Sequence, residues 1–267
     1  MRYRNRKAEQ CVLNFYKTLP KALRQFSVDI REFISTLKTC TIYSYQEFAE
    51  RHNISVGEVI AYCESETGCT HKHGDKYIVM FNDSPDIPQE RKTFTLAHEL
   101  GHILLRHLII LESYKIYHSS YPNQHFEQDA NSFAACLLCP MPVLSKLKPK
   151  SVSAIRASFG LSFDASSILF GDYLRYDKYH NITWHNDMLN LFDIRNGAAE
   201  LLARRFDYMC EAGETAPAVS KPKIEDYRSE PTSVNKIHKK DAEESMPPEL
   251  FERLEHDWLY PEKLGLS

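Results

Sequence analysis

The chain has 267 residues, 43% of them hydrophobic, and a formal net charge of −3. This length and composition predict a sizeable core, in one large domain or two small ones. The small negative charge excludes a general attraction to nucleic acids or anionic membranes. No apolar stretch approaches the roughly 20 residues of a membrane-spanning helix, so we expect no membrane association.

The cysteines and the N-terminal residues favour a cytoplasmic protein. Seven cysteines stand at irregular spacings that do not resemble a disulfide framework. Cys136 and Cys139 have the CxxC spacing, but they lie in an apolar helical run without a second pair, so we expect core thiols. Residues 1–7 are basic, yet no apolar run follows them as it would in a signal peptide. These features are typical of a reducing compartment.

The first 63 residues show helical patterns. Residues 1–40 are predicted to be helical, with an apolar stripe at helical spacing in their second half. Residues 44–63 contain two short helical patterns around a turn at 53–55, the outline of a helix-turn-helix. A DNA-reading version needs basic residues on its second helix, where Glu58 and Glu64 stand instead. Packing or substrate support is the favoured role, and DNA contact is the alternative.

A β-hairpin is predicted next. Residues 77–81, Tyr-Ile-Val-Met-Phe, are β-branched and aromatic, which predicts the return strand of a hairpin that turns near Gly74. Cys69, His71 and His73 stand at every second position before this turn, and their side chains are of types that can bind a metal. No fourth ligand stands at a recognised spacing, so we expect them to be solvent-facing hairpin residues.

The stretch that follows contains a metal-binding pattern. A helix is predicted from near Pro88 to about Ile110. His98 and His102 project from one line of this helix because they stand four residues apart, so both imidazoles can bind one Zn²⁺. Glu99 lies about 100° further round, where it can act as a general base on water held by the metal. The alternative is a buried helix whose histidines only form hydrogen bonds within the core.

A second helix, predicted at 127–140, supplies a third ligand. Its apolar stripe is Ala130, Ala134, Leu137 and Leu138. Glu127 and Asn131 lie on the same line, and a carboxylate on a buried stripe needs a partner. Glu127 would complete a His₂Glu site with one position open to water, as in catalytic zinc sites, and Asn131 would support a ligand from the second shell. The alternatives are Asp129 as the ligand, or Glu127 as a plain N-terminal charge.

The rest of the chain is mainly helical by pattern. Residues 154–174 contain a second helix-turn-helix outline, with basic residues too few to support DNA contact strongly. A further helix is predicted at 196–209. Residues 211–247 have the composition of a flexible linker, and an amphipathic helix at 248–259 is predicted to dock on the body of the protein or on a partner.

Three segments of the sequence resemble those of the ImmA/IrrE family of metallopeptidases. They are His98-Glu-Leu-Gly-His102, Glu127-x-x-Ala-Asn-x-Phe-Ala-Ala-x-Leu-Leu-x-Pro140 and Phe159-Gly-Leu-Ser-Phe-Asp-Ala, within roughly residues 28–176. The resemblance implies zinc ligation by both histidines and Glu127, with Glu99 as the catalytic base. It also implies a protein substrate, a DNA-binding repressor or related regulator of a mobile element or stress response.

The sequence departs from the family pattern at two places. Cys139 stands where the family often has Met, and Arg106 stands where a His is frequent, with His107 displaced by one. We expect neither departure to touch the ligands. The resemblance also does not identify the residue that stabilises the oxyanion. The candidates stand in a predicted loop at residues 112–125: Tyr114, Tyr117, His118, Tyr121 and His125.

We therefore expect an α+β fold, mainly helical, with a small β-sheet beside the helix of His98. The expected segments are a peptidase core at 1–145, a helix-turn-helix-like region at 146–210, and a partly flexible linker with a short helix at 211–267. The favoured function is zinc-dependent peptide hydrolysis in a repressor or regulator. The alternatives are a DNA- or repressor-binding regulator with structural zinc, and a toxin partner or inert relic, against which the intact Glu99 argues.

Overall fold

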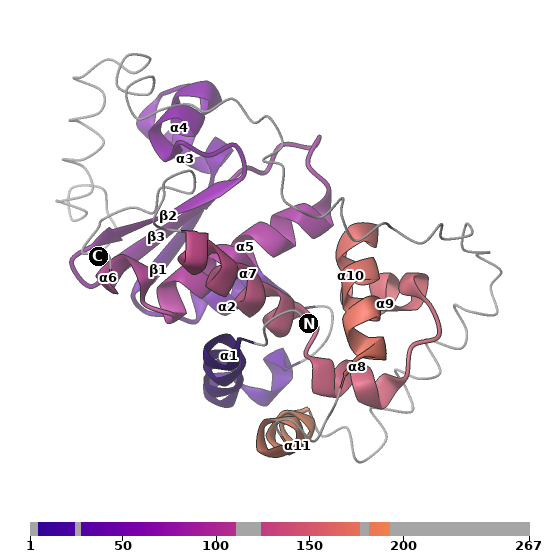
Figure 1. The fold of residues 1–267 in the computed structure, drawn as a ribbon. Helices are drawn as coiled ribbons and strands as arrows, with labels where there is room; N and C mark the ends of the chain where they lie inside the picture. Colours follow the sequence, from indigo (N-terminus) through magenta and orange to yellow (C-terminus); the bar gives the residue numbers. More distant parts are fainter. Residues whose placement is uncertain (1–4, 25–27, 111–123, 177–181, 193–267) are drawn as a thin grey trace. The chain divides into compact units, whose positions relative to one another are not determined.

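The computed structural model describes most of the first 192 residues, and every structural statement below refers to those ranges. They are 5–24, 28–110, 124–176 and 182–192. These residues form helices and one three-stranded mixed sheet, which confirms the α+β class (Figure 1). Several predicted segments lie outside them: the aromatic residues 114–121, the helix 196–209, the linker 211–247 and the helix 248–259.

The described residues divide into two compact units. The sheet unit comprises residues 31–110 and 124–130. The helical unit comprises residues 5–24, 28–30, 131–176 and 182–192. The boundary falls inside one helix, α7 (Gln124–Leu138), between Ala130 and Asn131. The limits predicted from sequence, at residues 145 and 210, stay a prediction.

The sheet has the strand order β1-β3-β2. β2 (Gly68–His73) and β3 (Lys76–Phe81) form the predicted antiparallel hairpin, with Gly74 in the left-handed conformation at the turn (φ 56°). β1 (Cys40–Ser44) pairs with β3 in parallel and was not predicted, although its residues Cys-Thr-Ile-Tyr-Ser are rich in β-formers. β2 is therefore an edge strand of the sheet.

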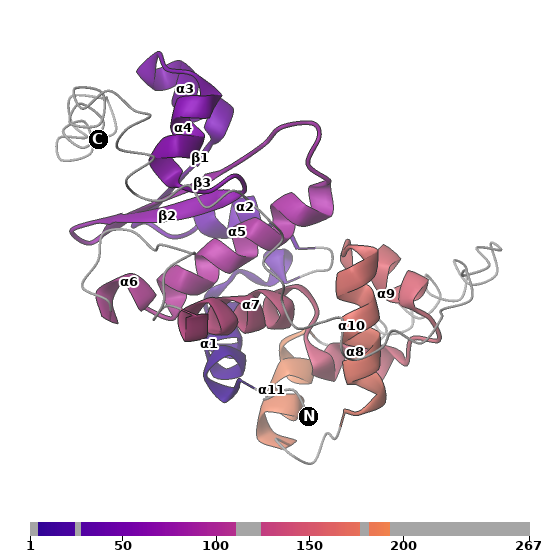
Figure 2. The ribbon, with the colours of Figure 1, turned by 45° about the horizontal axis from the view of Figure 1, so that its top comes forward.

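Helices cover both faces of β2. Figure 2 shows α5 (Gln89–Leu104) running alongside β2, and α5 also contacts β3. The opposite face packs against α3 (Tyr45–His52) and α4 (Val56–Cys63) in one apolar cluster. Alternation along β2 directs neighbouring side chains to these two different layers.

This two-sided burial corrects one prediction. Cys69 and His71 do not face solvent, because they point into the α3–α4 layer and are 0% and 2% exposed. The His71 ring lies 5.0 Å from that of Tyr62, between centroids. His73, nearer the turn, is half-buried. The prediction was wrong because hairpin residues were assumed to have one free face.

Reciprocal hydrogen bonds begin both helices of the 44–63 pair. The Ser44 hydroxyl accepts from the Glu47 N–H, and the Glu47 carboxylate accepts from the Ser44 N–H. Ser55 and Glu58 form the same capping box at α4. Asn53 ends α3 in the left-handed conformation. The predicted pair of helices is thus confirmed, and Glu58 has a local structural role.

The helix predicted from Pro88 to Ile110 is two helices. α5 ends at Leu104, and α6 (His107–Ile110) follows. Arg106 between them has a φ of 63°, which a continuous right-handed helix does not allow. The apolar pattern did not reveal this break, because both helices bury residues of the same core.

Buried hydrogen bonds join the helices of the helical unit. The Tyr16 hydroxyl donates to the Leu137 carbonyl, and the Trp184 indole N–H donates to the Glu9 carbonyl. The helices at the N-terminal end of the chain are α1 (Arg6–Thr18), the 3-10 helix η1 (Lys21–Leu23) and α2 (Ile30–Ser35). The later helices are α8 (Met141–Leu147), α9 (Val152–Phe159), α10 (Phe163–Leu174) and α11 (Ile182–Leu191). The α9–α10 pair was predicted, whereas α8 and α11 were not.

The segment Gln124–Leu147 is long and apolar enough to cross a membrane by length and composition alone, contrary to our expectation from the sequence. Most of it is buried inside the protein, and core helices of globular proteins pass the same test. Four side chains of its predicted stripe are at most 1% exposed: Ala130, Ala134, Leu137 and Leu138. Burial also raises the pKa of the Cys139 thiol, as expected of a core cysteine, while Cys136 is half-buried.

Gly68 allows the close approach of β2 and α5. A Cβ atom at this position would lie 2.5 Å from the Thr95 methyl carbon and 3.0 Å from the Met80 carbonyl oxygen. The first distance is shorter than real Cβ contacts and the second is tighter than most of them, so a side chain at this position would require the Thr95 side chain or the backbone to shift.

We expect Gly68→Ala to lower the free energy of unfolding by about 1–3 kcal/mol, because the added methyl group overpacks this contact. The matched control is Gly57→Ala on α4, where the nearest atom to an added Cβ is 3.8 Å away. That variant should be neutral or stabilised by up to about 1 kcal/mol, because alanine favours helix. Denaturant titration measures both, and equal stabilities would contradict the close approach.

Candidate metal centre

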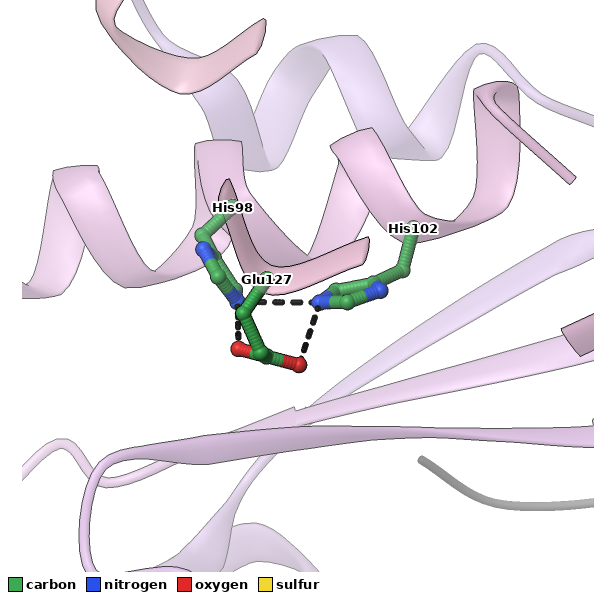
Figure 3. Close-up of side chains that lie close together, drawn as sticks. All are labelled: His98, His102 and Glu127. Atoms are coloured by element: carbon green, nitrogen blue, oxygen red, sulfur yellow. Dashed lines mark hydrogen bonds and ion pairs between the residues drawn. The ribbon is translucent and has the colours of Figure 1, made fainter. Parts of the chain in front are cut away.

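Two neighbouring helices bring three metal-binding side chains together. His98 and His102 stand one turn apart on α5, and Glu127 comes from the first turn of α7. Figure 3 shows the three side chains pointing toward one another. Their ligand atoms, one from each residue, all lie within 4.8 Å of one another.

The distances between these atoms suit one small cation. The two Nε2 atoms are 2.9 Å apart, and Glu127 oxygens lie 3.2 Å from Nε2 of His98 and 3.4 Å from Nε2 of His102. Ligands at about 2.0–2.1 Å from Zn²⁺ in a tetrahedron are about 3.3 Å apart. Two neutral imidazoles and one carboxylate therefore fit a zinc ion in donor type and in spacing.

Burial makes an ion in this position favourable. The side chains of His98, His102 and Glu127 are 11%, 0% and 18% exposed. Polar groups removed from water to this degree cost free energy unless they are paired. Among the described residues, Asp129 does not join the group, so the geometry favours Glu127 over this alternative.

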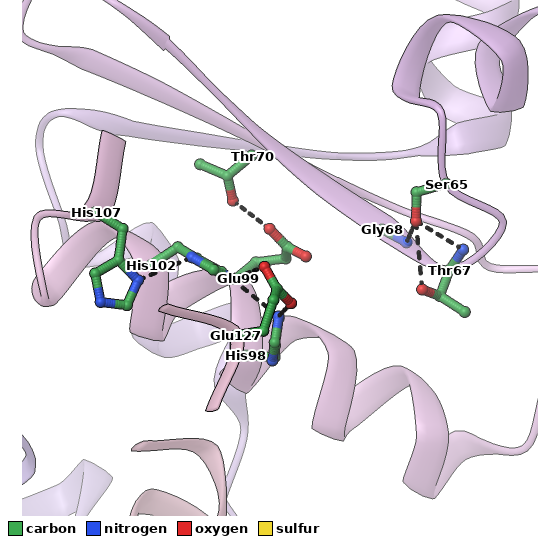
Figure 4. A network of polar contacts seen from close by, with 9 residues as sticks. All are labelled: Ser65, Thr67, Gly68, Thr70, His98, Glu99, His102, His107 and Glu127. Atoms are coloured by element: carbon green, nitrogen blue, oxygen red, sulfur yellow. Dashed lines mark hydrogen bonds and ion pairs between the residues drawn. The ribbon is translucent and has the colours of Figure 1, made fainter. Parts of the chain in front are cut away.

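Glu99 lies next to the group without belonging to it. Its side chain is 2% exposed and reaches from α5 towards β2, where its Oε2 accepts a hydrogen bond of 2.7 Å from the Thr70 hydroxyl (Figure 4). This contact holds the carboxylate in one orientation. Sequence reasoning missed Thr70, because nothing in its local pattern separates it from any other strand threonine.

The helix and the strand have matched spacings along this contact. Gly68 lies against Thr95, and Thr70 lies against Glu99. Two residues advance about 6.8 Å along a strand, and four advance about 6 Å along a helix. The close approach at Gly68 therefore leads directly to the hydrogen bond on Glu99.

His107 corrects a further expectation. We expected that neither departure from the family pattern would touch the ligands, but Nδ1 of His107 lies 2.9 Å from Nδ1 of His102. Its ring is fully buried. The contact depends on the interruption of the helix at Arg106, which helical periodicity does not predict.

Two other predicted residues are exposed. Asn131 is exposed and belongs to the helical unit, so its support of a ligand stays a prediction. His125, in the first turn of α7, is also exposed. The other candidates for oxyanion stabilisation lie outside the described residues.

Comparison with known proteins gives a family match over part of the chain. Residues 49–167 match the model of the peptidase M78 family, described as the IrrE N-terminal-like domain. This stretch contains both histidines, Glu99 and Glu127. No curated protein and no solved structure matches the chain.

We expect the wild-type protein to bind one Zn²⁺ per chain and Glu127→Gln to weaken binding strongly. The loss should exceed the roughly 10- to 100-fold effect of removing a second-shell partner, because a ligand charge is lost. Asp129→Asn is the matched control, since it removes one charge from the same helix and should leave the affinity unchanged. Competition with a chromophoric chelator measures each Kd, and a larger loss in Asp129→Asn would identify Asp129 as the ligand.

Proposed function

We propose that the chain is a zinc-dependent endopeptidase of the ImmA/IrrE family of metallopeptidases, on the premise of the family match over residues 49–167. The observation that carries the proposal is the convergence of His98, His102 and Glu127 beside a buried carboxylate, Glu99. Three ligands and a neighbouring base are the parts that a hydrolytic zinc site requires.

His98, His102 and Glu127 would hold the metal, which when bound polarises the scissile carbonyl and lowers the pKa of the attacking water. Glu99 takes a proton from that water and passes it to the leaving amine. The Thr70 hydroxyl donates to Oε2 of Glu99, and this hydrogen bond constrains the orientation of the carboxylate that would take the proton. Thr70 thereby orients the base.

A hydrolytic role fits this site better than a structural one. Structural zinc sites usually complete four-fold coordination with protein donors. The group here has three donors among the described residues, and a structural site has no need of a buried base beside them. The order β1-β3-β2 also leaves β2 as an edge strand next to Glu99, which supports binding of an extended peptide as an added strand.

The proposed substrate is a DNA-binding repressor or related regulator in the cytoplasm, as the family resemblance implies. Direct DNA contact by this chain has less support. At the C-terminal end of α10, Arg175 is paired with Asp172 at 2.9 Å, which offsets its charge. On α4, Glu58 caps the helix where a DNA-reading motif would have a basic side chain. If the protein were mainly a DNA-binding regulator, its DNA affinity would fall steeply with salt.

Glu99→Gln tests the activity. We expect this variant to keep its zinc and to cut its substrate about 100- to 10,000-fold more slowly, because the general base is lost. The assay is co-expression with DNA-binding regulators encoded beside the gene, followed by detection of fragments. Glu90→Gln, near the start of the same helix, is the control and should cut at the wild-type rate. Undiminished cleavage by Glu99→Gln would overturn the proposed mechanism.

Thr70 tests how the base is held. Thr70→Val is isosteric but removes the donor to Glu99, so cleavage should slow by about 10- to 100-fold, the usual worth of a hydrogen bond to a charged group. Thr70→Ser keeps the hydroxyl and should restore most of the rate. The zinc affinity should be the same in all three proteins. A slow Thr70→Ser with a normal Thr70→Val would show that packing of the methyl group matters instead.

A further inference from the structure

We propose that His107 is a positioning residue of the metal centre, which fixes the tautomer and the ring orientation of His102 by accepting a hydrogen bond from its Nδ1–H. The inference rests on the metal site proposed above. It assigns a role to a residue outside the ligand group and outside the motif of His98 to His102.

The two nitrogens of His102 face different partners. Nε2 lies with the ligand group, 2.9 Å from Nε2 of His98 and 3.4 Å from Oε1 of Glu127. Nδ1 lies 2.9 Å from Nδ1 of His107 (Figure 4). A neutral imidazole carries one proton, so an Nε2 that binds a metal leaves the proton on Nδ1. Nδ1 of His107 is the atom placed to accept it, which puts the proton of His107 on Nε2, itself a buried atom.

The environment of His102 favours an acceptor beside its Nδ1. His102 and His107 are both fully buried. A buried N–H with no acceptor costs about 1–3 kcal/mol, and that cost would oppose the tautomer that binds the metal. Ligating histidines usually donate this N–H to a carboxylate, a backbone carbonyl or water. Here a neutral imidazole takes that position, so it orients the ligand without adding negative charge to the site.

The backbone is shaped to deliver His107 to this position. In a continuous helix, residue 107 would lie about 140° around the axis from His102, because five residues advance about 500°. Arg106, in the left-handed conformation, breaks that course, and the rings of His102 and His107 come to 5.0 Å between centroids. The Arg106 side chain is exposed, and His107, the next residue, makes the buried contact with His102.

His107 also contacts the helix that carries the third ligand. Its ring centroid lies 4.7 Å from that of Phe126, the residue before Glu127. One side chain therefore touches a ligand on α5 and the neighbour of a ligand on α7. If packing were its whole role, another aromatic ring of similar size would replace it without loss of metal affinity.

Three substitutions separate positioning from packing. His107→Phe keeps an aromatic ring against Phe126 but has no acceptor. His107→Gln has a side-chain carbonyl that can accept the Nδ1–H. The control is His71→Phe, which replaces a buried histidine of the same unit that faces the α3–α4 layer. Circular dichroism of each protein verifies that it is folded.

The readout is zinc affinity, measured without substrate by competition with a chelator. We expect His107→Phe to bind Zn²⁺ about 10- to 100-fold more weakly than wild type, His107→Gln to lose less, and His71→Phe to be unchanged. In the zinc-loaded wild-type protein, long-range ¹H–¹⁵N correlation spectra should show His102 protonated at Nδ1 and His107 at Nε2.

Wild-type affinity in His107→Phe, or a zinc-loaded His107 protonated at Nδ1, would overturn the inference. An equal loss in His71→Phe would also overturn it, because the effect would then follow from general destabilisation. If the wild-type protein bound no zinc, the proposed metal site itself would fail. That outcome differs from tight zinc binding whose affinity does not change when His107 is substituted.

Discussion

The hydrogen bond from Thr70 to Glu99 joins the helix that carries the chemistry to the sheet that supports it. It requires α5 and β2 to approach closely, and Gly68 makes that approach sterically possible. The opposite face of β2 is held by the α3–α4 layer, so the strand cannot retreat from the helix. The orientation of Glu99 thus depends on the lack of a side chain at Gly68 and on the α3–α4 layer behind β2.

The ligand group lies on a surface that would otherwise be core. His98, His102, Glu99 and Glu127 are polar side chains largely removed from water on α5 and α7, which costs stability when they are unpaired. A bound cation would satisfy three of them, and Thr70 satisfies part of Glu99. Metal binding should therefore also stabilise the fold. Without metal, such a site lowers the stability of the fold. In return, its side chains are already in place when the metal and the substrate bind.

Much of the local structure could be predicted from the sequence. Two capping boxes, at Ser44 and Ser55, set the starts of helices within a few residues, and the turn at Gly74 set the hairpin. Within the described residues the unpredicted β1 pairs with β3, 37 residues further along the chain, so its strand character depends on a distant partner. The exposure predicted for His71 was wrong for a similar reason, since the layer that buries it comes from α3 and α4.

The sequence by itself predicted the three side chains that the structure brings together as a possible metal site. His98, His102 and Glu127 follow from helical periodicity on two helices, and periodicity is a local property of the chain. The tertiary structure alone decided what surrounds that group. Thr70 and Glu99, which are 29 residues apart in the sequence, meet because the strand and the helix lie side by side. His107 reaches His102 because the helix is interrupted at Arg106. Both contacts depend on the relative placement of segments, and side-chain spacing along one element carries no information about that placement.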